Sequence, residues 1–227
     1  MLVDYLIKQN WLQTPRIIKA FRMINRADFL PAEFKDYAEM NQVFPIGWGK
    51  NISQPLISAF MLEKLQPRNG ENILEIGAGS GWVTALLAEI ISQPSDNPKV
   101  VSRKGKIIAL EAISDLKNLA QKNVSKYGFA EKNLVEFFCA DGVKGYPLID
   151  KRTDLPLGFD SIISLASLKE LPAAWKGQVK VGGSIVAFIG SSVWQLIKTG
   201  EDKFDEIEYP ALMFMPAFGQ FQTVRVC

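Results

Sequence analysis

The stretch that organises this sequence is Asn72–Trp82, N-I-L-E-I-G-A-G-S-G-W, where a short apolar run meets a glycine at every second position. The run Asn72–Ile76 predicts a strand, and the apolar pattern of residues 83–91 predicts a helix. Glycines between the two allow the backbone angles of a tight turn and let a ligand approach the main chain closely. We therefore predict a strand, a turn and a helix that form a nucleotide-type binding site.

The spacing of these glycines indicates the kind of cofactor. A dinucleotide fingerprint, G-x-G-x-x-G/A, needs a small residue at its sixth position, where this sequence has Trp82. The pattern is instead E-x-G-x-G-x-G, beginning at Glu75, and it resembles motif I of S-adenosylmethionine-dependent methyltransferases with a Rossmann-like sheet. A glycine-rich turn without a ligand is the alternative interpretation. The acidic residue Glu111, placed after the next predicted strand, favours the cofactor site.

The composition predicts an intracellular globular protein. The chain has 227 residues, 48% of them apolar, which is enough for one core. We expect a helical N-terminal subregion with the substrate-side loop in residues 1–70 and the cofactor-binding core in residues 71–227, together in one compact domain. No apolar run approaches membrane-spanning length and no signal-peptide pattern is visible, so we expect a cytoplasmic location without a membrane partner. A net charge of +2 is too small to predict a nucleic-acid partner.

Residue usage narrows the chemistry further. The sequence has no histidine, which excludes histidine triads and imidazole acid-base catalysis. Its two cysteines, Cys139 and Cys227, form no disulfide framework and no metal-ligand spacing, so we expect no metal. Cys139 lies inside a predicted strand and is interpreted as a core residue. Any enzyme here must work without a histidine base.

The order of predicted elements gives the fold class. Helices are predicted within residues 2–9, from Pro15 after the N-cap Thr14, and from the Ser53-Gln54-Pro55 sequence, with residues 44–49 as a loop. Strands at 106–110, 134–139, 159–165 and 183–189 then follow, with helices at 114–127, capped by Ser114, and at 172–179; a hairpin of 193–198 and 204–209 ends the pattern. We predict an α/β fold: a Rossmann-like, doubly wound, mostly parallel sheet with an antiparallel C-terminal hairpin and an N-terminal helical extension. Residues 92–105 and 144–158 are interpreted as polar surface loops.

Ligands of open parallel sheets bind beyond the carboxyl ends of the strands, where two carboxylates are predicted. Glu111 could accept hydrogen bonds from both ribose hydroxyls of a nucleoside. Asp141 could accept one from the exocyclic amine of adenine. An exposed glutamate and an ordinary Asp-Gly turn are the corresponding alternatives.

A second motif, P-I-G-W-G-K-N-I-S-Q-P in residues 45–55, carries a closer family resemblance. It is similar to the P-I-G-x-G-x-T-I-S-x-P motif of protein-L-isoaspartate O-methyltransferases, which methylate the abnormal carboxylate left by deamidation and isomerisation of asparagine and aspartate. The likeness covers nearly the whole chain. Its other parts are residues 26–31, 159–163, 171–172, 178, 182–183, 190 and 214–216.

The resemblance implies roles for individual residues. It implies that Ser53 contacts the accepting carboxylate, that Gly77, Gly79 and Glu111 hold the methionine-ribose part of S-adenosylmethionine, and that Asp141 and Gly142 lie near its adenine. The cofactor-binding set that it implies is completed by Glu75, Ala78, Ser80, Gly81 and Ala112, and the substrate-side set is Asn51, Ile52, Gln54 and Leu165. The implied reaction releases S-adenosylhomocysteine and acts on isoaspartyl peptides and proteins, with the enzyme as a monomer.

The implied reaction suits a chain without histidine. A carboxylate with a pKa of about 4 is ionised at neutral pH and can attack a sulfonium methyl group without a base. The enzyme then aligns the reacting atoms and excludes water. Ser53 would orient the acceptor as a hydrogen-bond donor; a helix N-cap is the alternative role of a serine at this position.

The sequence departs from the family pattern mainly on the substrate side. Asn51 replaces a threonine, Glu39 and Asn41 replace an aromatic residue and an aspartate, and residues 164–167 replace a T-A-A-P-like segment. Two alternatives therefore stay open. One is a methyltransferase with a different acceptor, such as RNA or a small molecule, and the other is a cofactor-binding protein that has lost turnover.

Overall fold

The computed structural model describes residues 1–94, 104–146 and 158–210. The helices are α1 (Leu2–Lys8), α2 (Pro15–Met23), α3 (Pro55–Leu65), α4 (Trp82–Ser92), α5 (Ser114–Ser125) and α6 (Ala173–Gln178), and the 3-10 turns are η1 (Arg26–Phe29), η2 (Ala32–Tyr37) and η3 (Gly142–Lys144). The strands are β1 (Phe44–Gly47), β2 (Lys50–Ile52), β3 (Asn72–Ile76), β4 (Lys106–Glu111), β5 (Val135–Cys139), β6 (Phe159–Leu168), β7 (Val179–Ile189), β8 (Ser192–Gly200) and β9 (Lys203–Pro210). The motif at 214–216, Cys227 and most of the two predicted surface loops lie outside the described residues.

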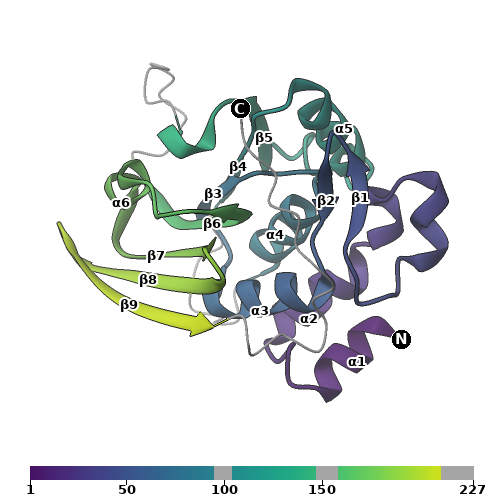
Figure 1. Cartoon of the computed structure of the whole chain (residues 1–227), viewed down its shortest axis with the longest axis horizontal. Helices are drawn as coiled ribbons and strands as arrows, with labels where there is room; N and C mark the ends of the chain where they lie inside the picture. The colour runs from purple at the N-terminus through teal and green to yellow at the C-terminus, as the bar shows by residue number, and fades with distance from the viewer. Residues whose placement is uncertain (95–103, 147–157, 211–227) are drawn as a thin grey trace.

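Seven strands form one sheet in the order β5-β4-β3-β6-β7-β8-β9. The pairs among β5, β4, β3, β6 and β7 are parallel, and β3 lies between β4 and β6, so the glycine-rich stretch leaves the middle of the parallel part. β4 is buried along its whole length, as expected for a parallel strand with both faces covered. The chain therefore has the predicted α/β fold with a mostly parallel sheet (Figure 1).

The C-terminal end of the sheet is antiparallel, as predicted. β8 pairs with β7 from Ser184↔Ile197 to Ile189↔Ser192, and β9 pairs with β8 in the same sense. Figure 1 shows these strands curving away on one side of the molecule, with the β1–β2 hairpin on the opposite side. The β1–β2 hairpin thus lies near the parallel strands and away from β9.

Each face of the sheet has its own hydrophobic core. The larger core joins one sheet face to α2, α3, α4 and α5, and α3 and α4 are buried nearly all round because they lie between the sheet and other elements. The second core is centred on Trp175 of α6, which is fully buried and donates from Nε1 to the carbonyl oxygen of Gly142 at 2.7 Å. Burial of the tryptophan therefore anchors the segment after β5.

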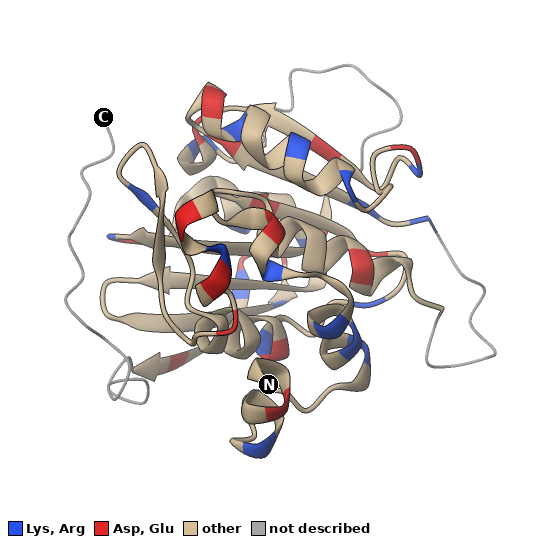
Figure 2. Cartoon of the chain, turned by 90° about the vertical axis from the view of Figure 1, so that its right-hand side faces the viewer, with Lys and Arg blue, Asp and Glu red and all other residues tan. Residues whose placement is uncertain are grey.

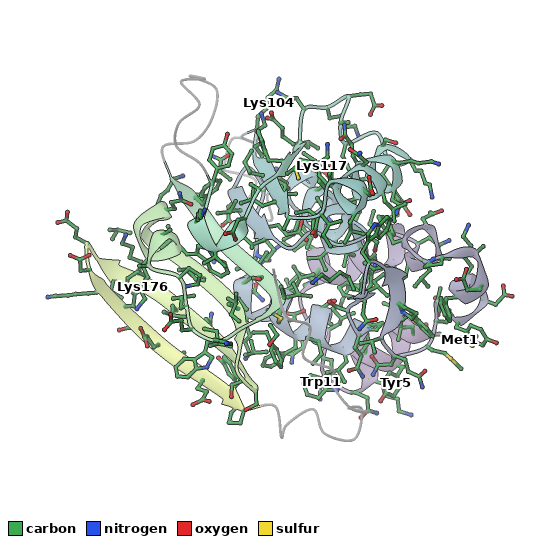
Figure 3. The ribbon with its side chains drawn as sticks, turned by 45° about the horizontal axis from the view of Figure 1, so that its top comes forward. Met1, Tyr5, Trp11, Lys104, Lys117 and Lys176 are labelled. Carbon is green, nitrogen blue, oxygen red and sulfur yellow. The ribbon has the colours of Figure 1, made fainter. Side chains whose placement is uncertain are left out.

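The N-terminal helices pack on this framework through aromatic and polar contacts. Thr14 occupies the N-cap position of α2, as predicted, but its hydroxyl donates to Glu63 of α3 at 2.6 Å and makes no capping bond. Trp11 packs edge-to-face on Phe60, with ring centroids 6.0 Å apart. Figure 3 shows Trp11 at the same end of the molecule as Met1 and Tyr5, with Lys104 at the opposite end.

Residues 44–49 are not a loop, and that prediction was wrong. They form β1 and the turn to β2 in an antiparallel hairpin whose last pair is Gly47↔Lys50. Trp48 and Gly49, the two turn residues, have φ angles of 51° and 66°. Positive φ at both positions suits the twist of a two-residue hairpin turn, so the glycines that indicated a loop instead permit the turn.

Three smaller predictions also need correction. Ser114 is the first residue of α5, because Ile113 is its N-cap, and the helix ends at Ser125 instead of 127. Cys139 is exposed and not part of the core, because it ends β5, the edge strand of the sheet. A period-two pattern cannot distinguish an edge strand from a central one.

Charges of both signs are mixed along the described part of the chain. Figure 2 shows Lys and Arg interspersed with Asp and Glu along the ribbon, without a long stretch of one sign. Within the part of the chain that the structure describes, no helix combines the length and apolar character needed to cross a bilayer.

Candidate active site

The glycine turn after β3 is built from positive φ angles. Gly77, Gly79 and Gly81 have φ angles of 78°, 59° and 88°. The amides of Gly77 and Ala78 donate to the carbonyl oxygen of Leu110 at 2.9 and 3.1 Å, which ties the turn to the end of β4. The alternating glycines are therefore required by the turn itself.

Residues from other elements lie close to Gly77 and Gly79. A Cβ at Gly77 would lie 3.2 Å from Cβ of Ala166, and one at Gly79 would lie 3.5 Å from Cδ1 of Ile46. Ile46 belongs to β1, so the hairpin of the P-I-G motif lies directly against the glycine turn. The two motifs singled out in the sequence are thus parts of one site.

Glu111 faces this turn from the end of β4. Its side chain is 6% exposed, Oε2 accepts from the amide of Gly79 at 3.0 Å, and Oε1 accepts from the amide of Ile113 at 3.1 Å. Cys139, across the ladder from Glu111, donates from Sγ to the carbonyl oxygen of Ala112 at 3.6 Å. A carboxylate held by two amides at a strand end is an oriented acceptor, which a nucleoside with two adjacent hydroxyls needs.

Glu75 lies beneath the turn and is 2% exposed. Its Oε2 accepts from the hydroxyl of Thr84 in α4 at 2.5 Å. Burial raises the pKa of Glu75 to about 8, the bond from Thr84 lowers the pKa in part, and the negative charge of Glu111 adds to the increase. At neutral pH Glu75 is therefore largely a neutral acid that joins β3 to the first turns of α4.

The ionisation of Glu75 gives a first prediction. Its pKa is about 8 in the folded chain and near the ordinary value of 4.5 in the unfolded chain. Between these two pH values Glu75 is protonated in the folded chain and ionised in the unfolded chain. The free energy of unfolding therefore falls as the pH rises from 4.5 to about 8. We expect Glu75→Gln to melt at a higher temperature than wild type at pH 8, by about 5 °C or more, and to lose most of that advantage at pH 5. Differential scanning calorimetry across this range measures the difference.

The control for this prediction is Glu201→Gln, on the exposed turn between β8 and β9. Its melting temperature should follow wild type at every pH. A Glu75→Gln difference that is constant from pH 5 to pH 8 would contradict the raised pKa.

Asp141 and Gly142 follow β5 at the same edge of the sheet. Asp141 is the N-cap of η3, and its Oδ1 accepts from the amide of Val143 at 3.0 Å. A Cβ on Gly142 would collide with Ile76 of β3, so this position must be glycine. Oδ1 of Asp141 thus forms the turn that was the alternative interpretation, and the residue also lies just beyond the carboxyl end of β5.

Ser53 follows the hairpin and lies just before α3. The N-cap of α3 is Gln54 and no side chain caps it, so the N-cap alternative for Ser53 is wrong. Ser53 is half-buried, and its carbonyl oxygen accepts from Nη2 of Arg26 at 3.1 Å. The backbone of Ser53 is thus held in place, and its hydroxyl makes no hydrogen bond to the residues that the structure describes.

The other substrate-side residues differ in exposure. Asn51 is exposed, Ile52 is buried and Leu165, in β6, is half-buried against the larger core. Gln54 is buried and donates from Nε2 to the carbonyl oxygen of Asn41 at 3.0 Å. Gln54 therefore holds the chain before the hairpin, while Asn51 presents its side chain to solvent.

The departures at Glu39 and Asn41 have structural partners. Glu39 accepts from the amide of Leu2 at 2.8 Å and so caps α1. Oδ1 of Asn41 accepts from the amide of Leu56 at 2.9 Å, in the first turn of α3. Each side chain thus satisfies a helix amide and has a structural role.

Sequence reasoning missed three residues of this region: Arg26, Ile46 and Thr84. Arg26 was only part of a matched motif, yet it is 5% exposed and its guanidinium contacts the rings of Phe44 and Trp82. Its place in the motif-like passage Arg26–Pro31 was the available signal. The contacts of Ile46 and Thr84 depend on long-range packing, and no pattern predicts them.

Several buried polar atoms near the turn have no hydrogen-bond partner among the described residues. They are Oγ of Ser80, Oγ of Ser164 and Nε1 of Trp82. Ser80 follows Gly79 in the turn, and Ser164 lies beside Ile76 in the ladder of β3 and β6. Such groups are uncommon in folded proteins and are available to a ligand or to water. Within the described part of the chain, no group of three or more His, Cys, Asp or Glu side chains could hold a metal ion.

The fold and the site together define a class. A mostly parallel sheet whose central strand leads into a glycine turn, facing a carboxylate at the end of the next strand, is that of a Rossmann-like, S-adenosylmethionine-dependent methyltransferase. The family model described as protein-L-isoaspartate(D-aspartate) O-methyltransferase (PCMT) matches residues 1–220. The chain belongs to this family.

Individual proteins agree with this membership. The chain is 32% identical over 224 residues to a protein-L-isoaspartate O-methyltransferase of Staphylothermus marinus, covering 97% of this chain and 93% of that one. It is 33% identical to one of Petrotoga mobilis, with coverages of 97% and 95%. Among solved structures, a beta-aspartate methyltransferase (PCMT) from Plasmodium falciparum in complex with S-adenosyl-L-homocysteine is similar with a TM-score of 0.74, 19% identity and coverages of 92% and 93%. That last likeness concerns the fold.

Proposed function

We propose that this protein transfers the methyl group of S-adenosylmethionine to the carboxylate of L-isoaspartyl residues in damaged peptides and proteins. The observation that carries the proposal is the contact between the two motifs: Ile46 of the P-I-G hairpin lies against Gly79 of the turn that faces Glu111. A cofactor turn and an acceptor loop at one site are what a group transfer between two substrates requires.

The residues present suit this cofactor. Gly77 and Gly79 have no side chain that would cover the main chain of the turn, and Oγ of Ser80 is a buried polar atom without a partner among the described residues. We assign Glu111 to the ribose hydroxyls, and Asp141 with Gly142 to the adenine end. When bound, S-adenosylmethionine supplies an electrophilic methyl group on a sulfonium, and its product is S-adenosylhomocysteine. Ala78 and Ala112 complete the set that we assign to the cofactor, and Glu75 and Gly81 support the turn from its buried side.

The protein's own task is to hold and align the acceptor. An isoaspartyl carboxylate is ionised at neutral pH and needs no base, so Ser53 acts by donating a hydrogen bond to one of its oxygens. The buried side chains of Ile46 and Ile52 exclude water from the hairpin side. Asn51, Gln54 and Leu165 are assigned to the acceptor side. A monomeric state and a cytoplasmic location stay predictions from the sequence.

The direct test is transfer of labelled methyl from S-adenosylmethionine to an isoaspartyl peptide, beside the matched aspartyl peptide. We expect a base-labile methyl ester on the isoaspartyl peptide alone. Binding of S-adenosylhomocysteine without any transfer would support a protein that has lost turnover, and transfer to neither peptide but to RNA or a small molecule would support a different acceptor.

Replacing Ser53 gives a second prediction. Ser53→Ala removes one hydrogen bond to a charged acceptor, which is worth about 1.5–3 kcal/mol, so kcat/KM for the isoaspartyl peptide should fall about 10- to 100-fold. The Kd of S-adenosylhomocysteine, measured by calorimetry, should not change. Ser125→Ala is the matched control, because the hydroxyl of Ser125 bonds only within α5 to the carbonyl oxygen of Lys122. Unchanged kinetics in Ser53→Ala would remove Ser53 from the proposed site.

A further inference from the structure

Arg26 is buried in an unusual way. Its guanidinium is 5% exposed, and no carboxylate of the described residues forms an ion pair with it. Burial lowers its pKa to about 10, so the side chain still carries its charge at neutral pH. Burying a cation without a counter-ion costs free energy of folding unless hydrogen bonds replace the lost hydration, so the partners of this guanidinium matter.

The hydrogen bonds of Arg26 all go to backbone carbonyl oxygens. Nη1 donates to Ala38 and Met40, each at 3.2 Å. Nη2 donates to Gln42 at 2.7 Å and to Ser53 at 3.1 Å. A single nitrogen thus joins Gln42, two residues before the β1–β2 hairpin, to Ser53, the residue directly after it, which closes the hairpin at its base.

The rings that contact the guanidinium connect this clamp to the cofactor turn. Cζ of Arg26 lies 5.5 Å from the ring centroid of Phe44, at the start of β1, and 5.1 Å from that of Trp82. Trp82 is the first residue of α4 and directly follows Gly81 of the glycine turn. The same side chain therefore touches the hairpin, the backbone of Ser53 and the helix that begins at the turn.

We propose that Arg26 is a positioning residue for methyl transfer, which closes the base of the β1–β2 hairpin and sets Ser53 against the glycine turn. The inference rests on the proposed function and adds a residue that acts through Ser53 instead of touching the substrate. Only a planar guanidinium has two terminal nitrogens that can reach four divergent carbonyl groups. Lysine keeps the charge but offers one compact donor group. Arg26→Lys therefore distinguishes the effect of the positive charge from that of the four hydrogen bonds.

The test compares Arg26→Lys and Arg26→Met with Arg16→Met as a matched control. Arg16, on α2, also bonds backbone carbonyls, donating from Nε to Pro67 at 2.7 Å, but lies outside the site. We expect kcat/KM for the isoaspartyl peptide to fall about tenfold in Arg26→Lys and up to about 100-fold in Arg26→Met, because misplacement by about 1 Å has effects of this size. The Kd of S-adenosylhomocysteine should change far less. Arg16→Met should lose melting temperature without losing kcat/KM.

Hairpin order gives a readout that does not depend on activity. Amide hydrogen exchange of residues 50–52 should be faster in Arg26→Lys than in wild type, with the amides of β3 unchanged. If both Arg26 variants fail to fold, Phe44→Leu replaces them as the test, because it removes one of the rings that contact the guanidinium. It should lower both kcat/KM and the protection of the hairpin amides.

The results separate this inference from the proposed function. If the wild-type protein transfers no methyl group, the proposed function is rejected. Amide hydrogen exchange of residues 50–52 in Arg26→Lys then tests whether Arg26 holds the hairpin. An active wild type with unchanged kcat/KM and unchanged hairpin exchange in Arg26→Lys overturns the inference alone. Equal loss of peptide and S-adenosylhomocysteine binding also overturns it, since that would show a general structural role.

Discussion

Glu111→Ala should abolish useful binding of S-adenosylhomocysteine while the protein stays folded. In the proposed site this carboxylate accepts from two ribose hydroxyls, and each hydrogen bond to a charged group is worth about 1.5–3 kcal/mol. Their loss predicts an increase in Kd of about 100-fold or more. The amide of Gly79 also loses the acceptor that orients it at 3.0 Å, which loosens the turn further. Isothermal titration calorimetry measures the Kd, and circular dichroism checks the fold.

Two variants make this result specific. Glu111→Gln keeps the size of the side chain but removes its charge, so its Kd should lie between those of wild type and Glu111→Ala. Glu201→Ala removes an exposed glutamate on the turn between β8 and β9 and should bind like wild type. A Glu111→Ala protein with wild-type Kd would show that the carboxylate does not hold the cofactor.

Gly81→Ala should be the most destabilising single-methyl change in the turn. Gly81 has a φ angle of 88°, and a Cβ there would lie 2.9 Å from Cγ2 of Val124 and 3.0 Å from the carbonyl oxygen of Ala120, both in α5. The backbone strain is about 1–2 kcal/mol and the overpacking about 1–3 kcal/mol. We expect the melting temperature to fall by about 5–15 °C, since each kcal/mol shifts it by about 2–4 °C at this chain length.

Gly182→Ala is the matched control for that change. Gly182 has a φ angle of 84°, and a Cβ there would meet nothing within 4 Å. It therefore carries the backbone strain without the collision, and its melting temperature should fall by much less. Equal losses in the two variants would show that close packing of the turn on α5 contributes nothing.

The sequence predicted the parallel strands well because each strand is a short apolar run that neighbouring residues make recognisable. The run before Gly77 is short, apolar and ended by a turn, and Glu111 ends the next run of the same kind, so their arrival at one edge of the sheet follows from parallel pairing. The hairpin at Phe44–Ile52 was missed because its strands have four and three residues and their glycines indicated a loop. Cys139 was wrongly predicted to be buried, because the alternation of residues in one strand does not show whether that strand lies at the edge of the sheet.

What the sequence determined by itself was the order of the elements of the large sheet, the glycine turn and the family of the chain, because these depend on neighbouring residues and on motif spacing. Only the tertiary structure shows the raised pKa of Glu75, the contact of Ile46 with Gly79 and the four hydrogen bonds from the Arg26 guanidinium to backbone carbonyl oxygens. The physical reason is that burial and hydrogen-bond partners come from segments far apart in the chain. A side chain's pKa and its orientation follow from those partners, and no local pattern records them.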